Sequence, residues 1–378
     1  MCVTAKVQLK LDQHNLMNMA SRRKFYKHND RAMDPKTHKY LSIIIDGMTQ
    51  NTTLLPHLFA KPSWWSAQTA LQCQCTGILS WGASGFKADC EFTYRNVSDN
   101  SAFLCDNIER AILRNQAECR RMKIPYPSVL YIQLDNVSHN KSFCLVGFLC
   151  VLILRGVFDK IKVSFMVKGH THEIIDQMFS RLSVLLRKRD AITIEEMMKA
   201  CEEAYKPIPK CEHIQHQHDW DPYVKDPEIM TKFNHIKHNR CFKMELVDGK
   251  CMFSARTFMT SGEWSEPIEV VHRLPTEEHP KLRKTIPLTQ GKASQMEALH
   301  NAKKMLFDHN DQQDSTAQGM SEVQKVFWDE EVKKQVKICK GEDVNLSIPD
   351  HVWPEPSRDQ GKHAIANCTF ACFEFMPI

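Results

Sequence analysis

The chain lacks any apolar run long enough to cross a membrane. Its longest uninterrupted apolar stretch, residues 143–154, has 12 residues, whereas a membrane-spanning helix needs about 20. The first residues, 1–6, also lack the apolar segment that directs a protein to export. We therefore expect no membrane partner, and we interpret residues 143–154 as a helix buried against a sheet.

A strong excess of one charge is absent as well. The formal net charge is +5 over 378 residues, which permits nucleic-acid binding without demanding it. The 15 cysteines are scattered singly through segments with the pattern of strands and helices. We expect a reduced, intracellular protein that is long enough for two domains and a large core.

Two apolar runs each end at an acid. Residues 40–46 (YLSIIID) end at Asp46, and residues 129–135 (VLYIQLD) end at Asp135. Each run is typical of a buried strand that delivers a carboxylate to its C-terminal end, where open α/β sheets bind ligands. An Asp after a strand is also a common turn former or helix cap. Because the pattern returns along the chain, we favour a ligand site.

A third acidic cluster follows an apolar strand at 161–167. Residues 169–177 (GHTHEIIDQ) open a helix whose polar side carries Glu173 and Asp176. Three converging carboxylates form a site for a hard divalent cation, because Mg²⁺ and Mn²⁺ prefer oxygen ligands. The three acidic segments therefore predict two-metal phosphoryl chemistry on a nucleic acid.

The order of the expected elements indicates an α/β fold. After the strand at 40–46 come two antiparallel strands near 70–81 and 86–94, and then a helix with Asp99 as its N-cap. The strand ending at Asp135, the apolar helix, the strand at 161–167 and a helix capped by Thr171 follow. The TIEE sequence at 193–196 is a capping box that begins another helix. We expect a mixed five-stranded sheet with flanking helices.

Three motifs stand out in this order of elements: IDGMTQ at 45–50, QLDN at 133–136 and GHTHExxDQxFS at 169–180. They resemble an uncharacterised eukaryotic family of transposon-related proteins with a ribonuclease H-like core, and the βββαβαβα order is that of the same fold. The resemblance covers about residues 20–275. It implies a DDE/DDD transposase- or integrase-type core, a nuclease or strand transferase that acts on DNA, or on RNA, in the nucleus with two Mg²⁺ or Mn²⁺ ions. A homo-oligomer is compatible with it.

The resemblance assigns Asp46 and Asp135 to the first two catalytic, metal-binding acids. The third acid is open, because 37 residues lie between Asp135 and Glu173 and 40 lie between Asp135 and Asp176, and both spacings fit. We favour Asp176 as the metal ligand, since the helix dipole already explains Glu173 in the first turn. His170 can assist as a proton shuttle or as an outer ligand.

Two alternatives of other classes stay open. The fold can be kept as a binding or assembly module in a catalytically inactive, domesticated transposon relic. The GHTH sequence at 169–172 also resembles the Gly-His-x-His element of metallophosphoesterases, with residues 134–136 as a companion. That fold needs an upstream Asp-x-His and a Gly-Asn-His, and the sequence has neither.

A Pro-rich stretch at 207–222 carries four residues of the types that bind zinc, namely Cys211, His213, His216 and His218. Their spacing matches no closed zinc site, and solvent-facing histidines are ordinary in such a stretch. Zn²⁺ is therefore the less favoured interpretation.

The C-terminal part of the chain has a different character. Asp248-Gly249, between two alternating runs, predicts a β-hairpin within a small β-rich C-terminal module. We expect four parts: an N-terminal helical segment, the ribonuclease H-like core, a Pro/His-rich linker with the β module, and a polar, partly helical tail. Their bounds are 1–38, 39–206, 207–275 and 276–378.

Overall fold

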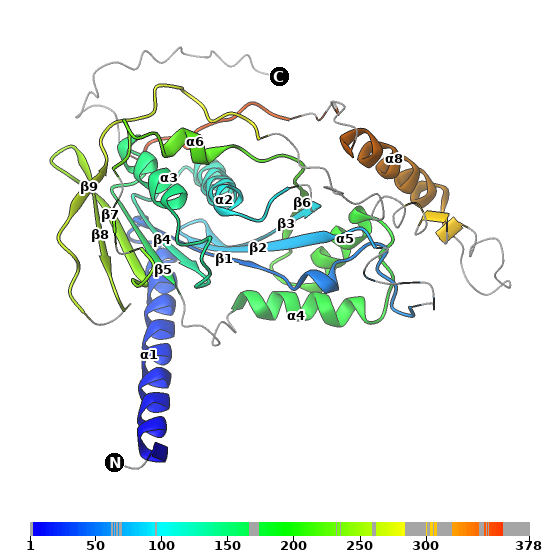
Figure 1. Ribbon diagram of the computed structural model, residues 1–378, viewed down its shortest axis with the longest axis horizontal. Helices are drawn as coiled ribbons and strands as arrows, with labels where there is room; N and C mark the ends of the chain where they lie inside the picture. The colour runs from blue at the N-terminus through cyan, green and yellow to red at the C-terminus, as the bar shows by residue number, and fades with distance from the viewer. Residues whose placement is uncertain are drawn as a thin grey trace.

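The computed structural model shows one central sheet with helices on both faces and a long N-terminal helix that projects away from it (Figure 1). It describes residues 3–61, 70–94, 97–165, 174–231, 236–258, 262–283, 320–339 and 348–357, together with a few isolated residues between these ranges. The strands are β1 Tyr40–Gly47, β2 Cys73–Gly82, β3 Gly85–Tyr94, β4 Val129–Leu134, β5 Lys160–Phe165, β6 Lys210–His213, β7 Cys241–Val247, β8 Lys250–Arg256 and β9 Ile268–Val271. The helices are α1 Val3–Ala32, α2 Ser101–Met122, α3 Phe143–Leu154, α4 Ile174–Leu186, α5 Ile194–Ala204, α6 Trp220–Val224 and α8 Glu322–Cys339, with a 3₁₀ turn at Gln50–Thr52.

The sheet is mixed, with the strand order β6-β3-β2-β1-β4-β5-β7-β8-β9. Strand β1 pairs parallel with β4, and β4 pairs parallel with β5. The hairpin of β2 and β3 is antiparallel, and β2 pairs antiparallel with β1. Because β1, β4 and β5 run in the same direction, their C-terminal ends lie at the same edge of the sheet.

The sheet has nine strands, not the five expected from the sequence. Strand β6 pairs parallel with β3 at one side, and β7 pairs antiparallel with β5 at the other. The hairpin at Asp248-Gly249 is confirmed, but β7, β8 and β9 continue the central sheet and do not form a separate one. The physical reason is that an exposed strand edge carries unpaired N–H and C=O groups, which a further strand satisfies.

The two faces of the sheet carry different helices. Helices α2, α3 and α6 pack on one face, and α1, α4, α5 and α8 contribute apolar side chains to the core of the other face. Helix α3 is apolar on all sides and lies almost wholly buried, which confirms the interpretation of residues 143–154. Within the described part of the chain, no helix is both long and apolar enough to cross a membrane.

The helix caps are confirmed in part. Thr193 and Glu196 form the expected capping box of α5. Asp99 is not the N-cap of α2, because the side chain of Asn100 accepts hydrogen bonds from the N–H groups of Ala102 and Phe103, at 3.0 and 3.1 Å. An N-cap needs extended backbone one position before the helix, and Asn100 occupies that position. Thr171 lies outside the described residues.

Candidate functional site

Two of the acids predicted from the sequence meet at one edge of the sheet. The parallel register pairs Ile44 of β1 with Gln133 of β4. Two residues further along, Asp46 and Asp135 therefore reach the same level of the two neighbouring strands. Both side chains line one cleft of about 280 Å³. The sheet topology thus brings together two acids that are 89 residues apart in the sequence.

The walls of this cleft come from four segments of the chain. They are the end of β1 with the residues after it, the start of β2, the N-terminal half of α2, and the loop after β4. Its lining residues are Ile45, Asp46, Gly47, Met48, Thr49, Gln74, Thr76, Asp99, Phe103, Leu104, Asn107, Asp135, Val137, His139 and Asn140. The lining combines apolar side chains with carboxylate, amide and hydroxyl groups, a mixture common in ligand sites.

Asp46 has the most unusual environment in the cleft. Burial, together with the negative charges of Asp176, Asp135 and Asp99, raises the pKa of its carboxyl from 3.8 to about 7. The N–H of Gly47, which donates a hydrogen bond to Oδ1 at 2.8 Å, opposes this shift only in part. A carboxyl group that titrates near neutral pH in a cleft is a candidate functional group.

Helix α4 supplies the third acid, Asp176, in its first turn. The helix packs on β2 at Gly77, the residue directly opposite Asp46 in the β1–β2 pairing. A Cβ atom on Gly77 would lie 2.7 Å from Cε of Met178 and 2.9 Å from the ring of Phe179. Glycine at this position therefore leaves room for Met178 and Phe179 of α4 against the strand. This close approach brings Asp176 near enough to act on the charge of Asp46.

The three acids fit a hard divalent cation by chemistry, since all their donors are carboxylate oxygens. The carboxylate oxygens of the three acids do not all lie within 4.8 Å of one another. Two other sets of described side chains do meet that distance. Like charges repel, and the same repulsion contributes to the raised pKa of Asp46. We therefore expect the carboxylates to move closer together when a cation is bound.

Sequence reasoning missed that Asp99 belongs to the cleft. Its Oδ2 accepts a hydrogen bond from Nε2 of Gln74 at 3.0 Å. Asn140 also lines the cleft, and its Nδ2 donates a hydrogen bond to the backbone oxygen of Asp135 at 3.1 Å. Asp99 stands beside an Asn just before a helix, which fits the N-cap pattern. No periodic pattern in the sequence distinguishes a capping Asp from an Asp that lines a cleft.

The two remaining predicted site residues, Glu173 and His170, lie outside the described residues. Of the two candidates for the third acid, the structure therefore describes only Asp176.

The four candidate zinc ligands of the Pro-rich stretch do not come together. Cys211 lies beside Cys90 and Cys201, whereas His218 lies beside Asp106 and Glu109. His213 packs edge-on against Tyr94, with 4.7 Å between the ring centroids. In strand β6, Cys211 and His213 project from the same face, and the chain then turns away, so His216 and His218 reach another part of the molecule.

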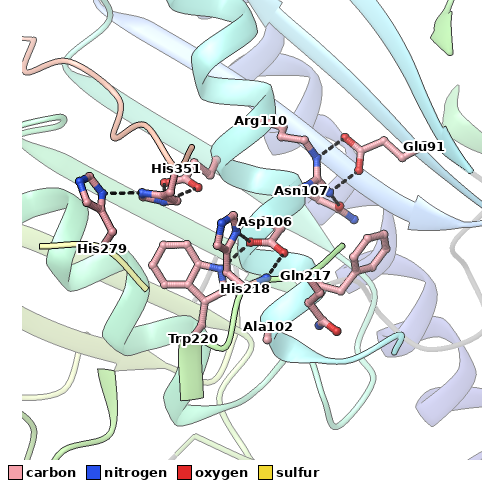
Figure 2. A network of polar contacts seen from close by, with 12 residues as sticks. Glu91, Ala102, Asp106, Asn107, Arg110, Gln217, His218, Trp220, His279 and His351 are labelled. Atoms are coloured by element: carbon pink, nitrogen blue, oxygen red, sulfur yellow. Dashed lines mark hydrogen bonds and ion pairs between the residues drawn. The ribbon is translucent and has the colours of Figure 1, made fainter. Parts of the chain in front are cut away.

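A second acidic group lies on the buried side of α2, and its partners come from distant segments (Figure 2). Oδ1 of Asp106 accepts from Nε1 of Trp220 at 2.6 Å and lies 2.9 Å from Nδ1 of His218, and Oδ2 accepts from the backbone N–H of His218 at 3.0 Å. Glu109, one turn further along, pairs with Nε2 of His351 at 3.0 Å. Burial raises the pKa of Glu109, and burial also lowers the pKa of His351 to about 4. This network fastens residues 217–220 and the segment at 348–357 to α2.

Residues 65–261 match the family described as domain of unknown function DUF7869, which is more than half of the 378 residues. The chain belongs to this family. No curated protein and no solved structure matches it. The DUF7869 segment contains Asp135 and Asp176, whereas Asp46 lies before its start. The candidate site therefore combines residues of the DUF7869 segment with a strand that precedes it.

Proposed function

We propose that the protein is a metal-dependent nuclease or DNA strand transferase with a ribonuclease H-like core of the transposase or integrase type. The observation that carries this proposal is the environment of Asp46. Its carboxyl is partly buried in a cleft with Asp135. The negative charge of Asp176 acts on it from helix α4, and its pKa is about 7. A structural acid at a strand end gains nothing from such surroundings, whereas an acid that binds a cation does.

The arrangement of the central strands supports the fold part of the proposal. Strands β3-β2-β1-β4-β5 form the middle of the sheet, with β1, β4 and β5 parallel and β2 antiparallel to β1. A mixed group of five strands with an antiparallel hairpin before the parallel strands supports the ribonuclease H-like part of the proposal. The additional strands β6 to β9 lie outside these five and leave the edge with Asp46 and Asp135 open.

Asp46, Asp135 and Asp176 would hold Mg²⁺ or Mn²⁺. When bound, a pair of such ions supplies activation of a water or 3′-hydroxyl nucleophile and stabilisation of the leaving oxygen. Asp46 binds a cation only as a carboxylate. Because its pKa is about 7, cation binding at or below neutral pH releases a proton from this residue.

A basic surface on α1 supports a nucleic-acid partner. Arg23, Lys24, Lys27 and Arg31 line a hollow of about 400 Å³ together with Ala20 and His28. Burial, and the positive charges of Arg256 and Lys162 from the sheet, lower the pKa of Lys24 to about 8. Several cations gathered at one place attract the phosphate backbone of DNA or RNA.

The test is Mn²⁺ binding by calorimetry, together with Mn²⁺-dependent cleavage of a generic DNA substrate. We expect the wild type to bind and cleave, and Asp176→Asn to lose both activities. Glu173→Gln should lose little beyond a helix-dipole contribution of about 0.3–1 kcal/mol. Asp221→Asn is the matched control, because Asp221 is exposed on α6 and pairs with Lys225.

The reverse ranking of the two variants would assign the third ligand to Glu173. Activity that survives in both variants would reject the three-acid mechanism. A wild type that binds Mn²⁺ weakly or not at all, and cleaves no substrate with any divalent ion, would favour the inactive transposon relic.

A further inference from the structure

Three cysteine side chains from three different elements meet on the face of the sheet that carries α4 and α5. Cys90 lies in β3, Cys201 in α5 and Cys211 in β6, and their Sγ atoms all lie within 4.8 Å of one another. The Sγ atoms of Cys201 and Cys90 are 3.3 Å apart. Cys90 and Cys211 are direct partners in the parallel pairing of β3 with β6. The sheet and the helix therefore fix this grouping.

We propose that Cys90, Cys201 and Cys211 bind a single Zn²⁺ ion. A tetrahedral zinc site with Zn–S bonds of about 2.3 Å separates its sulfur atoms by about 3.8 Å. The one separation of 3.3 Å and the upper bound of 4.8 Å for all three lie on either side of that value, so the ion fits with small side-chain movements. Cys75 of β2, whose thiol hydrogen-bonds with that of Cys90, is a candidate for the fourth position.

The surroundings of the cluster match a structural site of a soft cation. Cys90 and Cys201 are 0% and 1% exposed, while Cys211 is partly exposed and leaves a path for entry. Zn²⁺ displaces the protons of its thiol ligands when it binds, so a dry cluster of neutral thiols can become a thiolate site.

The position of the cluster gives the ion a structural role. Strand β6 has four residues and forms the end of the sheet beside β3. A strand this short at a sheet edge gains little from its ladder alone. An ion held by β3, α5 and β6 would fasten this edge strand and the end of α5 to the sheet. The site shares no ligand with the cleft at Asp46, so the inference stands independently of the proposed function.

The experiment measures zinc in the full-length protein purified without chelators, and the absorption of Co²⁺ added in its place. We expect about one zinc per chain and a thiolate-to-cobalt charge-transfer band. Cys201→Ser and Cys211→Ser should each lower zinc affinity at least about tenfold. Cys119→Ser is the matched control, because Cys119 is buried in α2 and contacts Asn115 outside the cluster.

If a serine variant fails to fold, the cobalt spectrum of the wild type decides. A wild type without zinc and without a charge-transfer band on Co²⁺ addition would overturn the proposal. A disulfide among the three cysteines in metal-free protein would overturn it too, as would copper in place of zinc. Loss of zinc in the control Cys119→Ser would assign the ion to another place in the chain.

Discussion

The two acidic groups beside α2 differ in how the protein satisfies them. Asp106, 1% exposed, receives hydrogen bonds from Trp220 and from the backbone and ring of His218. Asp46 and Asp135, in the cleft, each accept a side-chain hydrogen bond from the N–H of the following residue. A buried acid with several protein donors holds the fold together, whereas acids that face a cleft and one another oppose folding. Acids of the second kind are the ones to test for ligand binding.

The largest effect should come from breaking the buried group. Asp106→Ala removes the acceptor of two N–H groups and of the His218 ring, and it leaves them buried. We expect a loss of about 3–5 kcal/mol in the free energy of unfolding, measured by urea denaturation. Asp221→Ala, at an exposed pair with Lys225, is the control and should change stability by less than about 1 kcal/mol. A similarly small loss for Asp106→Ala would show that the network is not structural.

The next effect should have the opposite sign. The folded protein holds the Asp46 proton more tightly than the unfolded chain, since the pKa of Asp46 is about 7 against an ordinary 3.8. Its contribution to stability therefore falls as pH rises from about 4 to 7, and is lowest above 7. Asp46→Asn should raise the free energy of unfolding by about 2–4 kcal/mol at pH 8, because each pKa unit corresponds to about 1.4 kcal/mol.

The measurement is urea denaturation of Asp46→Asn and wild type at pH 4 and at pH 8. At pH 4 the two proteins should differ little, because the wild-type carboxyl is then protonated when folded. A variant that is less stable than the wild type at pH 8 would show that the Asp46 carboxylate is a structural acceptor.

The smallest effect on stability should come from Asp135→Asn. The amide oxygen of Asn can still accept the N–H of Asn136, which lies 2.6 Å from Oδ1 in the wild type. We expect a change within about 0.5 kcal/mol, together with loss of the increase in melting temperature that Mn²⁺ gives the wild type. The readout is thermal unfolding with and without Mn²⁺. Unfolding of the core by this substitution would make Asp135 a structural cap.

Local patterns in the sequence predicted much of the architecture. The run ending at Asp46, the run ending at Asp135, the apolar helix and the Asp248-Gly249 hairpin all form as expected. These features depend on contacts between near neighbours in the chain, such as alternation, capping and turn conformation. The N-cap of α2 shows the limit of such local patterns. We expected Asp99 there, but Asn100 takes the position, and both residue types favour it.

The sequence by itself determined the central strands, the helices around them and the acids at the strand ends, but it predicted a linker where β6 forms. Tertiary structure decided which of the other side chains meet. Cys211 was a candidate ligand with three histidines, yet the parallel pairing of β6 with β3 places it beside Cys90. His218 turned out to be a partner of Asp106, and Asp99 a wall of the cleft. Pairings between residues far apart in the chain follow from how whole elements pack, and short sequence patterns carry no record of that packing.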